Sequence, residues 1–270
     1  MFANFLNPTP IIDESSQYWI LDTFVWALEN FELSIFQNDT QLILPTNDFY
    51  PGNVRSVYEM AQSVFDRTLK YASLQHWPIV LVKPEDFKQR TVPRLEFTGI
   101  KRGELVRFDV PPTPEQLIHV SYNPNQVNQP QDLVASFAQA FATIMIVQSG
   151  KTPPGGLEFI PQAVDLVASF MGFGVMFSNT AYQFKGGCGS CFNPYANRNV
   201  ALSENDMIYC LALFCVVKSL PVKSVVIHLK SHLRPTFKSA YKALQKSIAG
   251  GSQATLVKAL TGRITAFKEY

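Results

Sequence analysis

The sequence predicts an α+β fold, because strand-like and helix-like patterns occupy different halves of the chain. Several short segments between residues 78 and 122 alternate apolar and polar residues, and turns that contain Pro or Gly separate them, as expected of strands. From residue 131 onward, apolar residues recur every three or four positions, which is the period of a helix. We therefore expect short strands in the N-terminal half and a helical C-terminal half around a central buried helix.

The N-terminal half, residues 1–125, begins with a predicted helix over residues 15–31, where Trp19, Phe24 and Leu28 recur at helical spacing. Ser15 or Ser16 can cap this helix, since a hydroxyl at that position accepts from the free N–H groups of the first turn. A second amphipathic helix is expected over residues 53–74. The predicted strands cover residues 42–45, 78–82, 94–99, 104–110 and 116–122.

The C-terminal half, residues 126–270, is predicted to be helical apart from the Gly- and Asn-rich stretch 179–202, which is expected to be irregular. The expected helices cover residues 131–149, 159–178, 203–219, 234–248 and 253–268. Because no stretch has the composition of a linker, the sequence predicts a single domain over residues 1–270.

Composition narrows the class of protein. Apolar residues make up 47% of the chain and charged residues 16%, which is typical of a folded core and unlike a disordered chain. The net charge is +2, and no group of Lys and Arg is dense enough along the sequence to predict nucleic-acid binding. We expect neither a secretory signal nor membrane insertion, because no apolar run approaches ~18–20 residues. The four Cys suggest no disulfide framework, so a reduced, cytoplasmic protein is expected.

The central predicted helix contains the stretch LVASFAQAFATIMI, residues 133–146, which is apolar almost all the way round. This stretch resembles the active-site helix of zincin-like metallopeptidases, which carries the pattern His-Glu-x-x-His. Two His four residues apart lie on one helix face and bind one zinc ion, and the Glu takes a proton from the metal-bound water. In this alignment Gln139 stands at the first His, Ala140 at the Glu and Thr143 at the second His.

Further segments extend the resemblance to a group of uncharacterised bacterial zincin-like proteins. Residues 153–184 are similar to the next helix of that group, where an acidic residue supplies the third zinc ligand, and Asp165 stands at that position. The other similar segments are residues 44–52, 202–217 and 228–244. The resemblance implies a zincin-like fold for most of the chain.

The substitutions on the central helix imply that the fold is kept and the metal site is lost. A Gln amide oxygen is a poor zinc ligand, Thr is no ligand in a structural zinc site, and Ala has no proton to transfer. Asp165 alone cannot hold zinc, since protein zinc sites use three or four ligands. The resemblance therefore implies a pseudoenzyme without a zinc cofactor. If the alignment is accidental, Gln139 and Thr143 are ordinary polar residues of the core. In either case a buried Gln139 needs a hydrogen-bond partner, and Asp165 is the natural candidate.

A second set of candidate ligands offers a different metal site. Cys188 and Cys191 form a C-x2-C pair, and His228 and His232 form an H-x3-H pair that would share one face of a helix. Both spacings suit a Cys2His2 zinc site, although the gap between the pairs is longer than in a zinc finger. Alternatively, the two thiols lie in a flexible Gly-rich loop and the two His lie on a solvated helix.

These patterns predict a non-catalytic protein that acts by binding another macromolecule, most simply a protein. Such a protein could be a regulator, an assembly partner or an immunity-type inhibitor. Two alternatives remain open at the level of sequence: a metal-dependent hydrolase that uses the Cys/His set, and a structural subunit whose apolar surface forms a homo-oligomer.

Overall fold

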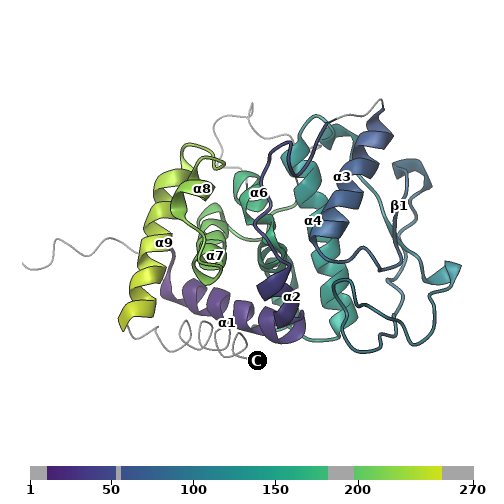
Figure 1. Ribbon diagram of the computed structural model, residues 1–270, viewed down its shortest axis with the longest axis horizontal. Helices are drawn as coiled ribbons and strands as arrows, with labels where there is room; N and C mark the ends of the chain where they lie inside the picture. The colour runs from purple at the N-terminus through teal and green to yellow at the C-terminus, as the bar shows by residue number, and fades with distance from the viewer. Residues whose placement is uncertain (1–10, 53–55, 182–197, 251–270) are drawn as a thin grey trace, which may run out of the picture.

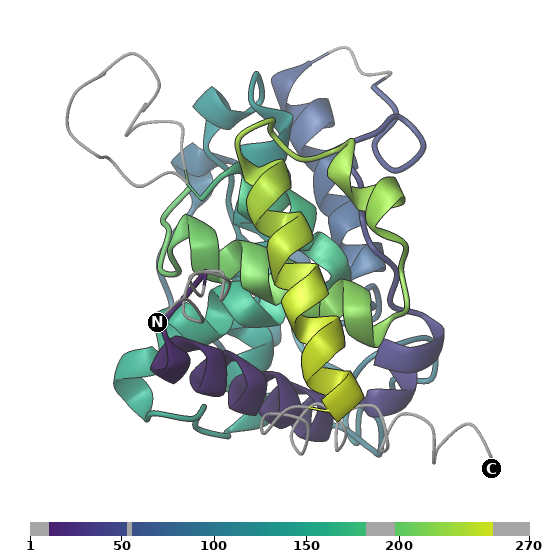
Figure 2. The same ribbon diagram turned by 90° about the vertical axis from the view of Figure 1, so that its left-hand side faces the viewer.

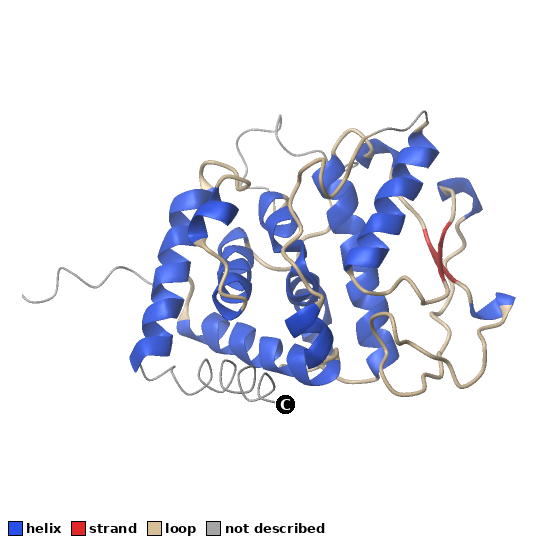
Figure 3. Ribbon diagram, viewed as in Figure 1, coloured by secondary structure: helices blue, strands red, loops and turns tan. Residues whose placement is uncertain are grey.

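The computed structural model describes residues 11–52, 56–181 and 198–250 (Figure 1). Helices make up 57% of the structure, and the sheet consists of two short parallel strands (Figure 3). The fold is therefore α+β, as the sequence predicts, but it contains much less strand than expected.

Helix α1 (Glu14–Asn30) begins the N-terminal half. Its cap is Asp13, whose carboxylate accepts from the backbone N–H of Ser16, so the prediction that Ser15 or Ser16 caps the helix is wrong. A carboxylate at this position also interacts favourably with the helix dipole. The first helix is followed by α2 (Leu33–Asn38), which the sequence did not predict.

Helix α3 (Val57–Tyr71) is the second predicted helix, and Ser56 caps it by accepting from the N–H of Glu59. Its buried face packs against the central helix of the C-terminal half. Between α3 and the central helix lie three single 3-10 turns, each of which begins with a Pro: η1 (Pro84–Asp86), η2 (Pro114–Gln116) and η3 (Pro124–Gln126).

The sheet pairs β1 (Ile79–Leu81) with β2 (Ile118–Val120) in parallel, with Ile79 opposite Ile118. The strands predicted over 94–99 and 104–110 are wrong as ladder strands, because these segments meet only at an isolated antiparallel bridge between Phe97 and Phe108. Alternation of apolar and polar residues indicates an extended segment with one buried side. It does not indicate whether another strand lies beside that segment.

Helix α4 (Pro130–Ser149) is the predicted buried helix, and it packs against α3 on one side and against the helices that follow it on the other. Its large apolar side chains, including Phe137 and Phe141, are almost completely buried. Gly150 follows α4 with φ 64°, the left-handed conformation that commonly ends a helix at Gly.

The next predicted helix, 159–178, is broken into pieces. They are η4 (Leu157–Phe159), α5 (Ile160–Ala168), the π-helical turn η5 (Ser169–Phe173) and α6 (Gly174–Asn179). The break is at Gly172, where φ is 101° and a Cβ atom would collide with the carbonyl oxygen of Gln41. The predicted strand 42–45 is also wrong, because this segment crosses the break, where Ile43 N–H donates to the Gly172 carbonyl at 2.9 Å.

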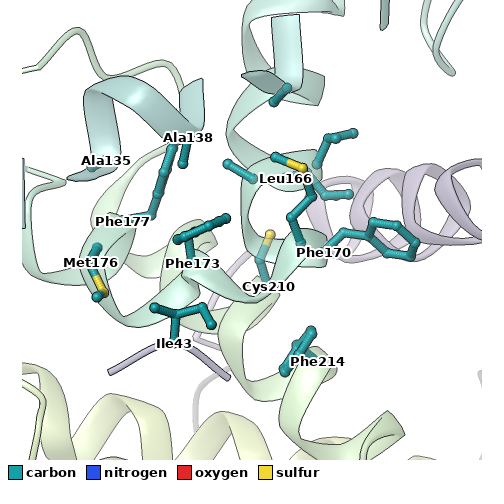
Figure 4. Packing of buried hydrophobic residues seen from close by; sticks show 14 of the residues in the cluster. Ile43, Ala135, Ala138, Leu166, Phe170, Phe173, Met176, Phe177, Cys210 and Phe214 are labelled. Carbon is teal, nitrogen blue, oxygen red and sulfur yellow. The ribbon is translucent and has the colours of Figure 1, made fainter. Parts of the chain in front are cut away.

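The remaining described helices complete the core. Helix α7 (Glu204–Val217) is buried along nearly its whole length, and α9 (Leu233–Gly250) packs along it after the short α8 (Val222–Val226). Figure 2 shows α9 on the outside of the molecule. Around the break, buried aromatic side chains fill the core: Figure 4 shows Phe170, Phe173 and Phe177 of the broken helix together with Phe214 of α7. The helix predicted over 253–268 lies outside the described residues.

Two apolar stretches, Pro130–Ser149 and Leu157–Asn179, are long enough to cross a membrane by length and composition alone. In the folded protein, 67% and 78% of the most apolar 18-residue part of these two stretches is buried. The core helices of many soluble proteins have the same length, composition and burial. The absence of membrane insertion and the cytoplasmic location therefore stay predictions.

Candidate functional site

The structure brings together two of the residues that the sequence singled out. Gln139 lies on α4 and Asp165 lies on α5, and these two helices pack side by side. The Gln139 side chain donates from Nε2 to Oδ1 of Asp165 at 3.0 Å. Asp165 is completely buried, whereas Gln139 is half-buried. This is the contact expected of a buried Gln139 whether or not the chain is related to zincins.

The other two positions of the degenerate motif take no part in this contact. The Thr143 hydroxyl donates to the backbone carbonyl of Gln139 on its own helix at 2.8 Å. Such a bond within the helix is the usual arrangement for Thr in a helix interior. Ala140 contributes only a methyl group. Like Gln139, both residues are half-buried on one side of α4.

Arg198 is the main residue of the site, and it was not among the residues predicted from the sequence. Its Nη1 lies 3.1 Å from Oδ1 of Asp165, and both side chains are completely buried. The guanidinium also donates to Thr180 Oγ1 at 2.9 Å and to the carbonyls of Asn199 and Phe177 at 3.0 and 3.3 Å. Its carbon Cζ lies 4.1 Å from the centre of the Phe177 ring, a cation–π contact.

Every hydrogen-bonding position of the Asp165 carboxylate is used. Oδ1 accepts from Gln139 and Arg198, and Oδ2 accepts from the backbone N–H groups of Ala201 and Leu202 at 3.0 and 3.1 Å. A carboxylate has about four lone-pair sites. Asp165 therefore joins α4, α5 and the segment 198–202 at one point.

A second carboxylate supports the buried cation. Asp132, buried in the first turn of α4, accepts from the Arg198 backbone N–H at 3.3 Å. Burial lowers the pKa of the Arg198 guanidinium, while Asp165 and Asp132 act in the opposite direction. An Arg guanidinium keeps its proton at neutral pH in proteins, so the network holds a full positive charge. This Arg–Asp pair is the strongest electrostatic feature of the site.

One sequence signal could have led to Arg198. Asp165 stands in the middle of the apolar run AVDLVASF, and a charge buried there requires an opposite charge and hydrogen-bond donors. The partner expected from the sequence was Gln139 on α4, which is uncharged. The charged partner, Arg198, stands more than thirty residues after Asp165 in the sequence. Local spacing could not locate it, because the two residues meet only where the folded chain returns to α5.

The residues present do not fit the zinc ion of a zincin. The oxygens of Asp165 are occupied by N–H donors, the Thr143 hydroxyl bonds its own helix, and the Arg198 cation touches the carboxylate that would have to bind the metal. A divalent ion at this point would meet a like charge and no free lone pair. Within the described residues, no group of three His, Cys, Asp or Glu is placed to hold a metal.

The proposed Cys/His set is described only in part, since Cys188 and Cys191 lie outside the described residues. His228 and His232 were expected to share one face of a helix. They do not, because both lie in the turn between α8 and α9. Pro235 favours this arrangement: it is tolerated in the first turn of α9 but would break a helix that began before His228. The exposed His232 ring instead pairs with Glu204 at 3.0 Å.

No protein-family model, curated protein or solved structure matches the chain. The resemblance to zincin-like proteins therefore depends on the quoted segments alone.

Proposed function

We propose that this chain is a non-catalytic protein of zincin-like fold that acts by binding another protein, as a regulator, an assembly partner or an inhibitor. The observation that carries the proposal is the complete use of Asp165 by internal donors. In this interpretation the Arg198 guanidinium supplies the positive charge that a zinc ion would supply to Asp165. The function then requires no metal or cofactor at this site.

The chemistry of the network supports a structural role for these residues. A general base or a nucleophile must reach its substrate, but Asp165 and Arg198 are completely buried and hydrogen-bonded to each other. Gln139 does not titrate, and the Thr143 hydroxyl has no base beside it, since it bonds a backbone carbonyl. The network fixes the segment 198–202 onto α4 and α5, and this connection would preserve a rigid binding surface.

The surface His residues give little support to a hydrolytic function. His76 pairs with Glu104 at 2.9 Å and His232 pairs with Glu204, and all four side chains are substantially exposed. Activated catalytic pairs are more often found in pockets that exclude water.

The test combines metal analysis with partner capture. We expect the purified full chain to carry no stoichiometric zinc, to show no zinc-dependent peptide hydrolysis, and to co-purify with one protein at constant stoichiometry from cells that express it. One zinc per chain that is lost in Asp165→Asn would overturn the proposal in favour of a metallopeptidase. Zinc that is lost in Cys188→Ser or His228→Ala would favour a relocated site. A homo-oligomer by light scattering, with no other protein bound, would favour a structural subunit.

A further inference from the structure

The charges of the chain are divided unequally along its length. Between Asp206 and Glu269 the sequence contains no Asp or Glu, although Lys and Arg recur throughout this region. The net charge of +2 for the whole chain hides this asymmetry, because the acidic residues lie almost entirely in the first 206 positions. Such an imbalance indicates a surface for an anionic partner.

Helix α9 arranges part of this charge in a row. Arg234, Lys238, Lys242 and Lys246 follow one another at intervals of four residues, and all four are exposed. Residues four apart lie on one side of a helix, about 6 Å apart along its axis, so the row extends over about 18 Å. We refer to these four residues as the basic stripe. Figure 2 shows α9, the helix that carries the stripe, on the outside of the molecule.

The basic stripe is not neutralised by the described part of the protein. None of its three lysines forms an ion pair with a described carboxylate. Arg234 donates to the backbone carbonyls of Leu229 and Ile227, which holds its side chain without cancelling its charge. Acidic residues do lie on the neighbouring α7, but Glu204 pairs with His232 and Asp206 bonds the Ser203 hydroxyl.

The stability of the helix does not explain the basic stripe. Like charges four residues apart destabilise a helix, and about 6 Å is within the Debye length of about 8 Å at physiological ionic strength. Arg234 stands in the first turn, where the helix dipole disfavours a cation, and no acid on α9 compensates. An arrangement that costs stability in the free protein is expected where a bound partner neutralises it.

A second row on α9 suggests the shape of that partner. An exposed small side chain stands three residues before each of the three lysines of the stripe. These small residues are Pro235, Ser239 and Ala243. Residues three apart are neighbours on a helix surface, so the small row runs beside the basic stripe. Small side chains let another helix approach closely, with its own row of side chains packed between those of α9.

The apolar face of α9 is already occupied. Leu233, Phe237, Tyr241 and Leu244 are buried, and α9 packs along α7. Between Leu233 and Ser247, the part of α9 whose side chains the structure describes, the exposed face has no aromatic ring on which bases could stack and no large apolar side chain that could enter a lipid layer. These features favour a protein partner over a nucleic acid or a membrane.

We propose that the basic stripe and the adjacent small row dock an acidic helix of a partner protein, whose Asp or Glu side chains recur every four residues. This inference rests on the proposed function and names the chemistry of the partner. Cations about 6 Å apart on α9 would face carboxylates at the same spacing on the partner helix. Charges at the rim of such an interface mainly accelerate association and select the partner.

The test uses two fluorescent synthetic peptides of the same composition. One carries Glu at every fourth residue of a helix, and the other carries the same residues in an order that distributes Glu around the helix. Binding to the full chain is measured by anisotropy at low and at physiological salt. The stripe variant is Lys238→Glu/Lys242→Glu, and the control Lys88→Glu/Lys151→Glu makes the same change in net charge at exposed sites outside α9. The stripe variant should fold, because each new Glu gains a cation four residues away.

We expect the ordered peptide to bind at least about fivefold more tightly than the permuted one, and its affinity to fall with salt. The stripe variant should lose at least about tenfold in affinity and the control no more than about twofold. Equal losses in both variants, or equal binding of both peptides, would overturn the proposal. Stripe-dependent binding to duplex DNA or to phosphatidylserine vesicles, with no binding of the ordered peptide, would also overturn it. None of these results depends on zinc, so a zinc-bound, hydrolytic protein would overturn the proposed function and leave this measurement interpretable.

Discussion

Removal of the buried cation in Arg198→Met tests the central argument about the site. Met keeps much of the length and apolar volume of the Arg stem but removes its charge and its donors. The variant leaves the Asp165 carboxylate buried, with Gln139 and two backbone N–H groups as its remaining donors. The free energy of unfolding should fall substantially, because a buried charge has lost its counterion.

The size of the effect follows from the burial of the pair. Both side chains are fully buried, and breaking a buried ion pair by removing one partner typically costs about 3–5 kcal/mol. The milder Asp165→Asn keeps an acceptor for Ala201 and Leu202, and it leaves Arg198 close to Asp132. We expect it to cost about 1–3 kcal/mol. In the double variant neither charge remains, so its cost should be smaller than the sum of the two single costs by about 1–3 kcal/mol.

The assay is equilibrium unfolding in urea, followed by far-ultraviolet circular dichroism and by tryptophan fluorescence. The exposed Arg90→Met serves as a control and should change the free energy of unfolding by no more than about 0.5 kcal/mol. If Arg198→Met costs less than about 1 kcal/mol, or if the two single costs add within about 0.5 kcal/mol, Arg198 and Asp165 are not energetically coupled and the interpretation of the site is wrong.

Three further predictions follow from other parts of the structure. Phe141→Ala should lower the free energy of unfolding by about 3–5 kcal/mol in the same assay, because the ring is fully buried and packs edge-on against Phe65; a change within error would show that α4 is peripheral. Introducing a His-Glu-x-x-His pattern on α4 (Gln139→His/Ala140→Glu/Thr143→His) should give little zinc uptake until Arg198→Ala is added, because the guanidinium is hydrogen-bonded to Asp165; strong uptake without that change would show that the cation does not block a metal. Burial raises the pKa of the Cys215 thiol from 9.0 to about 12. This thiol therefore stays protonated in the folded protein while it ionises in the unfolded chain, and its contribution to stability is complete below pH 9 and lost as the pH rises toward 12. The decrease in unfolding free energy between pH 9 and 11 should be smaller in Cys215→Ala than in the parent, and equal slopes would contradict the assignment.

Local patterns were sufficient for most of the helices. The 3.6-residue period of apolar side chains located α1, α3, α4, α7 and α9, because each buries one face or its whole surface. The same reasoning failed for the strands, since an extended segment becomes a ladder strand only when a partner strand lies beside it. Residues 94–99 and 104–110 have the alternation but form a single bridge.

The sequence by itself determined that Asp165, buried in an apolar helix, needs donors, and it placed Gln139 correctly among them. Only the tertiary structure decided that Arg198 supplies the opposite charge, because the chain brings that residue back across α5 from a segment without regular structure. The break at Gly172 has a similar origin. The packed structure shows why this position requires Gly: φ is 101°, and the carbonyl of Gln41, distant in sequence, occupies the space where a Cβ atom would lie. Contacts between residues far apart in the chain leave no periodic pattern in the sequence, so only the packed structure reveals them.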